Sequence, residues 1–184
     1  MEKKRRKRYA LLDRDGTIMV DKIYQSDPAQ TELLPNALEG LKLLAGAGFG
    51  LVVVTNQSGI NRGLIQPSEL EAVNRRLAEI LAVDGVALEA VYYCPHTPDE
   101  DCCCRKPMPG MALRAARDLG FDPRDCVVIG DREADVALGK AIGAMSVLVR
   151  TGGGRETEAE GKVKADHIAD DLKAAAEWML EKEW

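Results

Sequence analysis

The sequence predicts an α/β fold, a Rossmann-like, doubly wound parallel sheet with helices on both faces. Short, continuously apolar runs alternate along the chain with longer segments of helical periodicity. A run such as Leu51-Val52-Val53-Val54 is typical of a strand that is buried on both faces. Polar residues follow several of these runs directly, and open parallel sheets bind ligands where their strands end. These strand ends are therefore the first places to search for a site.

The order of the elements supports this fold. Strands are expected at residues 9–12, 51–54, 90–93, 126–129 and 145–149, with a short edge strand at 165–168. Helices are expected at about residues 35–47, 68–82, 109–119, 134–142 and 171–182. Ser68 and Glu71 have the spacing of a capping box at the start of the second helix. Trp178 is expected on the core face of the last helix, and His167 is expected to be structural. Residues 151–164 are rich in glycine and charge, which predicts a loop.

The composition favours a single domain that spans residues 1–184. Of the 184 residues, 46% are hydrophobic and 4% are aromatic, so aliphatic side chains must fill the core. The net charge of −5 argues against general nucleic-acid binding, and we expect neither a nucleic-acid nor a membrane partner. The basic run at residues 1–8 predicts a solvated tail; contact with a nucleic acid or an anionic surface is the weaker alternative. With no signal peptide in the sequence, we expect a cytoplasmic monomer.

Two carboxylates lie where the first strand ends. Asp13 and Asp15 follow the apolar run 9–12, and Gly16 lets the chain turn sharply behind them. Because closely spaced buried carboxylates repel each other, a cation is the natural compensation. The arrangement suits a Mg²⁺ site in which one carboxylate attacks phosphorus and the other transfers a proton. Taken alone, Asp-x-Asp-Gly is also an ordinary polar turn.

Other strand ends carry groups that suit phosphate chemistry. The segment Thr55-Asn56-Gln57-Ser58 offers hydroxyl and amide donors that can hold phosphate oxygens. Asp131 ends the fourth strand, and Asp135 follows on the same side one helical turn later, where it would hold a metal-bound water or cap the local structure. Arg105 is a bidentate partner for a phosphate or for sugar hydroxyls, although it and Lys106 together could also be a solvated basic pair.

Four of the five cysteines lie close together in one loop, residues 94–104. Three consecutive cysteines are a poor disulfide framework, whereas Cys-x-His and Cys-x-Cys pairs suit a closed, tetrahedral structural Zn²⁺ site. The expected ligands of this small zinc-binding loop are Cys94, His96, Cys102 and Cys104. Cys103 could replace either neighbour or remain a free thiol. The alternative is an incidental cysteine cluster, but the loop has few apolar residues to stabilise it without a metal.

Together, five segments of this chain resemble one branch of the haloacid dehalogenase (HAD) superfamily of phosphohydrolases. They are Asp-Arg-Asp-Gly-Thr (13–17), Thr-Asn-Gln-Ser-Gly-Ile (55–60), Tyr-Tyr-Cys-Pro-His (92–96), Cys-Arg-Lys-Pro (104–107) and Gly-Asp (130–131). This branch contains heptose bisphosphate phosphatases and histidinol-phosphate phosphatases. The resemblance covers about residues 9–150, and the cysteine loop makes it specific. Members of the branch lack a large cap domain, and this sequence has no insertion of that size.

The resemblance implies a role for each matched residue. Asp13 would attack phosphorus to form an aspartyl-phosphate, and Asp15 would protonate the leaving oxygen and then activate water. Mg²⁺ would be held by Asp13, the main-chain carbonyl of Asp15 and Asp131. Thr55 and Lys106 would stabilise the transferring phosphoryl group. The implied substrate contacts are Asp21, Lys22, Ile23, Tyr24, Thr55, Asn56, Gln57, Ser58, Arg105, Lys106 and Arg132.

The resemblance therefore implies a Mg²⁺-dependent phosphoric monoester hydrolase that acts on a small phosphorylated substrate. The first expectation is the C7 phosphate of D-glycero-D-manno-heptose 1,7-bisphosphate, in the carbohydrate metabolism that leads to lipopolysaccharide. Histidinol phosphate or another small phosphomonoester is the alternative. A zinc-stabilised binding protein without activity is a remote third possibility, because every catalytic position carries the residue type that the chemistry requires.

Overall fold

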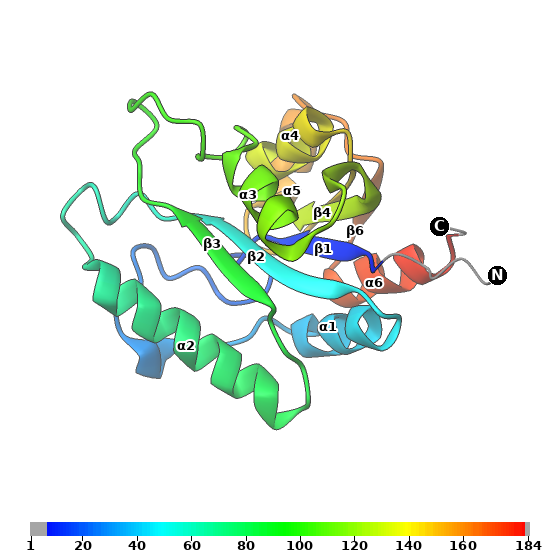
Figure 1. The fold of residues 1–184 in the computed structure, drawn as a ribbon, viewed down its shortest axis with the longest axis horizontal. Helices are drawn as coiled ribbons and strands as arrows, with labels where there is room; N and C mark the ends of the chain where they lie inside the picture. The colour runs from blue at the N-terminus through cyan, green and yellow to red at the C-terminus, as the bar shows by residue number, and fades with distance from the viewer. Residues whose placement is uncertain (1–6, 183–184) are drawn as a thin grey trace.

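The computed structural model describes residues 7–182, and the strands within this range form one parallel sheet (Figure 1). The strand order is β3-β2-β1-β4-β5-β6, and all neighbouring strands pair in parallel. The strands are β1 (Tyr9–Leu12), β2 (Gly50–Asn56), β3 (Ala90–Cys94), β4 (Cys126–Gly130), β5 (Met145–Val149) and β6 (His167–Ala169). The strand order reverses at β1, which lies between β2 and β4. Such a reversal opens a crevice beyond the carboxyl ends of the central strands.

Helices cover both faces of the sheet, which confirms the predicted doubly wound fold (Figure 1). One face carries α1 (Ala37–Gly46), α2 (Pro67–Val83) and α6 (Leu172–Leu180). The other face carries α3 (Gly110–Leu119), α4 (Glu133–Ile142) and α5 (Gly154–Glu160). Two short 3₁₀ helices, η1 (Pro28–Gln30) and η2 (Pro123–Asp125), lie in the connections.

Successive residues of β1 belong to two different apolar cores. Ala10 and Leu12 pack in the core beneath α1, α2 and α6, whereas Tyr9 and Leu11 pack in the core beneath α3 and α4. All four side chains are buried, because the period-2 alternation of a strand meets a helix layer on each side. This is the physical reason for the continuously apolar run in the sequence.

The connections that follow β1 and β3 are loops, so no cap-sized unit interrupts residues 7–182. The first connection contains only the 3₁₀ helix η1, and the second runs through the cysteine loop to α3. None of the helices within the described residues has the length and apolarity that crossing a membrane requires.

Three local predictions were wrong. Residues 154–160 form α5, which the sequence hid because Gly-Arg-Glu-Thr-Glu-Ala-Glu has no apolar face; only Gly154 and Thr157 of this helix are buried. The cap of α2 lies two residues earlier than expected, with the backbone N–H of Gln66 donating to Oε2 of Glu69 at 2.6 Å. The last strand begins two residues later than expected, at His167, which stacks on Trp178 with ring centroids 4.2 Å apart.

The expected basic tail falls partly outside the described residues, which begin at Lys7. Lys7 forms an ion pair with Glu89, and the Arg8 guanidinium lies 4.6 Å from the centroid of the Phe49 ring. The backbone carbonyl of Arg8 also accepts a hydrogen bond from Gly50 at 2.8 Å. Lys7 and Arg8, which were expected to belong to the solvated tail, therefore already contact the folded domain.

Candidate active site

A cavity of about 340 Å³ lies where β1, β2 and β4 end. Its lining residues are Asp13, Asp15, Asp21, Ile23, Tyr24, Thr55, Asn56, Gln57, Ser58, Arg105, Lys106, Arg132, Ala134 and Asp135. Every residue predicted to act in catalysis or substrate binding lines this cavity, except Lys22. The Lys22 ammonium instead donates to the Gln30 carbonyl at 2.8 Å and pairs with Glu32 at 3.3 Å. The fold thus brings residues from five separate parts of the sequence to one concave surface.

A buried lysine joins two carboxylates at the base of the cavity. The Lys106 ammonium lies 2.7 Å from Oδ1 of Asp13 and 2.7 Å from Oδ1 of Asp135, and it donates to the Val54 carbonyl at 2.7 Å. Burial acts to lower the pKa of Lys106, but the charges of Asp13 and Asp135 outweigh it and raise the pKa above its ordinary value. Lys106 therefore carries a fixed positive charge beside the Asp13 carboxylate.

Asp135 is a site residue whose role the sequence did not reveal. The spacing from Asp131 indicated the correct side of the helix, but the lysine partner comes from a distant loop. Oδ2 of Asp135 also accepts the backbone N–H of Arg132 at 2.9 Å, so this carboxylate both caps α4 and fixes Lys106. The expected capping role is present, and the ion pair with Lys106 is additional.

Asp131 lies beneath the cavity and is 1% exposed. Its Oδ2 accepts the backbone N–H of Gly153 at 2.7 Å, and its main-chain carbonyl accepts the Thr157 hydroxyl at 3.0 Å. Its Oδ1 is buried and has no hydrogen-bond partner among the residues that the structure describes. Burial, followed by the negative charges of Asp13 and Asp135, raises the pKa of Asp131 to about 8.

These carboxylates fit a divalent cation. Oxygens of Asp13, Asp131 and Asp135 all lie within 4.8 Å of one another, and the single Lys106 ammonium offsets only part of their mutual repulsion. The Lys106 ammonium pairs with Oδ1 of Asp135 and the backbone N–H of Arg132 donates to its Oδ2. Oδ1 of Asp131, by contrast, has neither an ion pair nor a hydrogen bond with the described residues. The donor set therefore favours Asp13 and Asp131 as the carboxylate ligands, as predicted, and hard oxygen donors suit Mg²⁺.

The Asp15 carboxylate is held from two sides. The Arg14 guanidinium contacts both of its oxygens, with the shortest distance 2.9 Å, and the Gln57 amide donates to Oδ2 at 2.7 Å. Burial raises the pKa of Asp15 above its ordinary value, and the adjacent Arg14 charge opposes this increase. A carboxyl group with a raised pKa can both donate and accept a proton near neutral pH.

The last two residues of β2 are more structural than the sequence suggested. The Asn56 side chain donates to the Lys106 carbonyl at 3.2 Å and accepts from the Lys106 amide at 3.0 Å. Asn56 thus fixes the backbone on which the lysine sits. Thr55 is 1% exposed, and its hydroxyl accepts from the Gln57 amide at 2.9 Å.

Apolar and cationic groups surround the opening of the cavity. Ile23 and Tyr24 both have left-handed backbone conformations, with φ of 44° and 55°, and they are 74% and 41% exposed. A β-branched residue at positive φ is strained, and such strain is concentrated at functional sites. Arg105 donates to the His96 carbonyl at 3.0 Å, which joins the cavity wall to the cysteine loop. Arg132 is the second cation, and half of its side chain is exposed.

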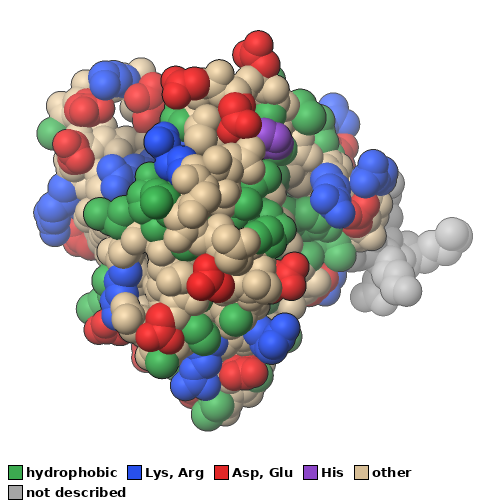
Figure 2. All heavy atoms as spheres, turned by 90° about the vertical axis from the view of Figure 1, so that its left-hand side faces the viewer, with side chains coloured by type: hydrophobic (Ala, Val, Ile, Leu, Met, Phe, Trp, Pro, Cys, Tyr) green, Lys and Arg blue, Asp and Glu red, His purple; other side chains and the backbone are tan. Residues whose placement is uncertain are grey.

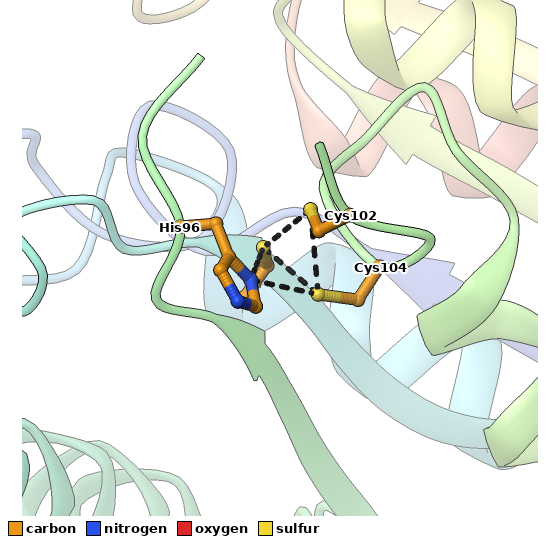
Figure 3. A group of neighbouring side chains, drawn as sticks. His96, Cys102 and Cys104 are labelled. Carbon is orange, nitrogen blue, oxygen red and sulfur yellow. Dashed lines mark hydrogen bonds between the residues drawn. The ribbon is translucent and has the colours of Figure 1, made fainter. Parts of the chain in front are cut away.

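The four predicted zinc ligands of the cysteine loop, residues 94–104, lie close together (Figure 3). The Cys104 sulfur lies 3.1 Å from the Cys94 sulfur and 3.3 Å from Nδ1 of His96, and all four ligand atoms lie within 4.8 Å of one another. Burial raises the pKa of the Cys94 thiol, and a bound divalent cation would reverse that shift. Cys103 is exposed and lies outside the cluster. The donor set and its compactness fit one tetrahedral zinc.

Comparison with known proteins decides the family. A model of HAD-hydrolase-like proteins matches residues 103–175. The D-glycero-β-D-manno-heptose-1,7-bisphosphate 7-phosphatase of Bordetella bronchiseptica is 36% identical over 174 residues, covering 94% of this chain and 97% of the relative. The enzyme of that name from Yersinia pestis is 39% identical, covering 88% of this chain and 89% of the relative. This chain belongs to the heptose-1,7-bisphosphate 7-phosphatase family of HAD-like hydrolases.

Solved structures of heptose-bisphosphate phosphatases share the fold. The B. bronchiseptica enzyme, determined with magnesium and phosphate, superposes with a TM-score of 0.89 at 35% identity and covers 96% of this chain and 99% of its own. The Burkholderia thailandensis enzyme superposes with a TM-score of 0.75 at 33% identity, covering 96% of this chain and all of its own. The predicted phosphatase class is therefore confirmed.

One face of this heptose-phosphatase family member carries mixed charges. On the face in Figure 2, Lys and Arg side chains are interspersed with Asp and Glu side chains and small apolar areas.

Proposed function

We propose that this phosphatase removes the C7 phosphate of D-glycero-β-D-manno-heptose 1,7-bisphosphate. The observation that carries the proposal is the buried Lys106 ammonium, 2.7 Å from the Asp13 carboxylate at the base of a polar cavity. This arrangement suits attack on a phosphoryl group, and the relatives that share most of this chain bear the name of the heptose enzyme.

The reaction has two balanced steps. An oxygen of Asp13 attacks phosphorus in line while the bond from phosphorus to the C7 oxygen breaks, and Asp15 gives its proton to the departing alkoxide. Water then attacks the aspartyl-phosphate, Asp15 takes a proton from it, and inorganic phosphate leaves with Asp13 regenerated. Lys106 offsets negative charge at the phosphoryl group in both steps.

Asp13, Asp131 and the main-chain carbonyl of Asp15 would hold Mg²⁺. Bound there, the ion would neutralise the carboxylate repulsion and the charge of the phosphoryl oxygens. The cation that the B. bronchiseptica structure contains is magnesium, which agrees with this assignment. In our proposal zinc is structural. It would be held by Cys94, His96, Cys102 and Cys104, away from the reacting atoms.

The second phosphate of a bisphosphate needs its own cations. Arg105 and Arg132 line the cavity, and both are placed to contact a phosphate or the sugar hydroxyls. Ile23 and Tyr24 would cover the apolar face of the sugar ring. We propose that the chain acts as a cytoplasmic monomer on this small substrate.

The decisive assay measures phosphate release with Mg²⁺ from both anomers of heptose 1,7-bisphosphate, beside histidinol phosphate. We expect the β anomer to have the highest kcat/KM. A higher kcat/KM for histidinol phosphate would overturn the substrate assignment while leaving the roles of Asp13 and Asp15 intact. Lack of turnover by folded, metal-loaded protein on all three substrates would contradict the proposed activity itself.

The second cationic subsite can be tested separately. Arg105→Met should raise KM for the bisphosphate much more than KM for a monophosphate of the same sugar, because only the bisphosphate loses an ion pair. Arg124→Met is the matched control, since the Arg124 guanidinium pairs with Asp122 next to η2, at the opposite end of β4. An equal rise in KM for both substrates would remove Arg105 from the second-phosphate site.

A further inference from the structure

Arg14, between the two motif carboxylates, is the largest fully buried side chain among the described residues. Its side chain is 1% exposed, so its guanidinium has given up its hydration. Burying a charge of this kind is costly unless hydrogen bonds and an opposite charge compensate for it. An apolar side chain would fill this position without the cost of burying a charge. The contacts that Arg14 makes therefore require an explanation.

Two different partners engage the Arg14 guanidinium. Nε and Nη2 form a fork on the Asp15 carboxylate, with four distances between 2.9 and 3.2 Å. Nη1 donates to Oδ1 of Asn74 at 2.6 Å. Asn74 lies within α2, and its neighbour Val73 packs in the core beneath the sheet. The guanidinium therefore links a helix of the scaffold to the carboxylate of Asp15.

This link constrains the direction of the Asp15 carboxylate. A planar guanidinium fork fixes both the position and the plane of a carboxylate, which a single point charge cannot do. The Gln57 amide, 2.7 Å from Oδ2, fixes the same group from the β2 side. The Asp15 side chain keeps 19% of its surface exposed, and it lines the cavity. Asp15 is thus held from behind while its remaining surface faces the substrate.

We propose that Arg14 and Asn74 form a positioning pair that aims the Asp15 carboxyl group at the leaving oxygen. The inference rests on the proposed role of Asp15 as proton donor. Arg14 does not line the cavity, so it acts through Asp15 and does not touch the substrate. Asn74 acts one step further away, by holding the guanidinium against α2.

The leaving group distinguishes this role from general support of the fold. A primary alkoxide, as in heptose 1,7-bisphosphate or histidinol phosphate, needs a proton as it departs, whereas 4-nitrophenolate leaves as a stable anion. The parameter kcat/KM reports phosphoryl transfer to Asp13 without the later hydrolysis step. A misdirected Asp15 should therefore lower kcat/KM for alkyl phosphates and leave kcat/KM for 4-nitrophenyl phosphate nearly intact.

The test compares both substrate classes in the full-length, metal-loaded protein, using the better of the two alkyl phosphates. Arg14→Met keeps the apolar stem and removes the fork, and we expect an about 10- to 100-fold loss for the alkyl phosphate, against less than about 3-fold for 4-nitrophenyl phosphate. Asn74→Leu should show the same selectivity with an about 5-fold loss, whereas Asn74→Asp keeps the acceptor oxygen and should restore activity. The control Arg124→Met removes an exposed Arg–Asp fork and should leave kcat/KM for both substrates unchanged.

The outcomes separate the inference from the proposed function. Equal losses on both substrates, or no loss from Arg14→Met, would overturn the positioning role. If circular dichroism shows that Arg14→Met does not fold, the Asn74 variants decide the question. They are compared by the loss of kcat/KM for the alkyl phosphate relative to the loss for 4-nitrophenyl phosphate. Asp15→Asn is measured in parallel: if it lowers turnover of alkyl phosphates selectively while the Arg14 and Asn74 variants do not, only the inference falls. If Asp15→Asn shows no selectivity, the assignment of Asp15 as proton donor falls with it.

Discussion

Lys106 and Asp135 form an ion pair of 2.7 Å at the base of the active-site cavity, and both side chains are almost completely buried. The same ammonium lies 2.7 Å from Asp13, so one lysine connects α4 to the end of β1. This relationship divides the acidic residues by role. Asp13 and Asp131 remain available to a cation, while Asp135 orients the lysine.

Asp13→Asn should abolish phosphate release while keeping the fold. The amide has the shape of the carboxylate but is not a nucleophile, and the change also removes one of three mutually repelling charges. We expect turnover to fall by at least about 10³-fold. Phosphate release and circular dichroism measured on the same preparation check this prediction, and turnover near the parent value would show that the nucleophile is misassigned.

Asp135→Asn should lower both activity and stability. The change removes one of the two carboxylates that hold Lys106, so the ammonium remains buried with less compensation. We expect the free energy of unfolding to fall by about 1–3 kcal/mol, since Asp13 and the Val54 carbonyl still contact the ammonium. Denaturant unfolding measures the effect. The exposed pair of Asp122 with Arg124 supplies the control, because Asp122→Asn removes a solvent-screened pair and should lower the free energy of unfolding much less than Asp135→Asn does.

Without Mg²⁺, stability should fall as pH rises. Burial and the neighbouring carboxylates raise the pKa of Asp131 to about 8, so between about pH 4 and pH 8 the folded chain holds a proton that the unfolded chain releases. The free energy of unfolding must therefore decrease across this range and level off above it. Thermal melts in Mg²⁺-free buffer measure the slope, and excess Mg²⁺ should reverse it. A slope that Asp131→Asn leaves unchanged would assign the effect to another group.

Gly152→Ala should weaken Mg²⁺ binding. Gly152 has a φ of +54°, and a Cβ there would overlap Oδ2 of Asp131 and lie 2.6 Å from the Gly16 Cα. We expect the Mg²⁺ concentration for half-maximal activity to rise about 10-fold, as for other changes behind a metal ligand. Gly85→Ala is the control for backbone strain, because Gly85 has a φ of +75° but nothing within 4 Å of the added Cβ. Equal effects of the two variants would contradict the prediction.

Metal analysis of the purified protein should find about one zinc per chain. Cys94→Ser removes a buried ligand and should lose the zinc together with several kcal/mol of stability, because metal binding stabilises the loop. Cys103→Ser should keep both, since this thiol is exposed and outside the cluster. A folded, fully active protein without zinc would refute the structural role.

Local sequence determined much of this protein. Continuously apolar runs marked β1, β2 and β4, because a strand covered by helices on both sides is buried at almost every position. The run that marked β5 is broken only by Ser146, which is also buried. The spacing of Cys94, His96, Cys102 and Cys104 indicated their convergence, because all four lie within one short loop. The strand ends also showed where the cavity would form, since parallel strands place their carboxyl ends on one edge of the sheet.

Tertiary structure alone decided the partners of the charged side chains. The contact of Lys106 with Asp135 and that of Arg14 with Asn74 each join segments that are distant in sequence. Lys22 turns away from the cavity because its own loop offers nearer acceptors, and α5 forms on a polar sequence because Thr157 and Arg150 anchor it. A residue's type and its immediate neighbours set its propensity, but the partner that compensates a buried charge is whichever group the packed elements bring within reach.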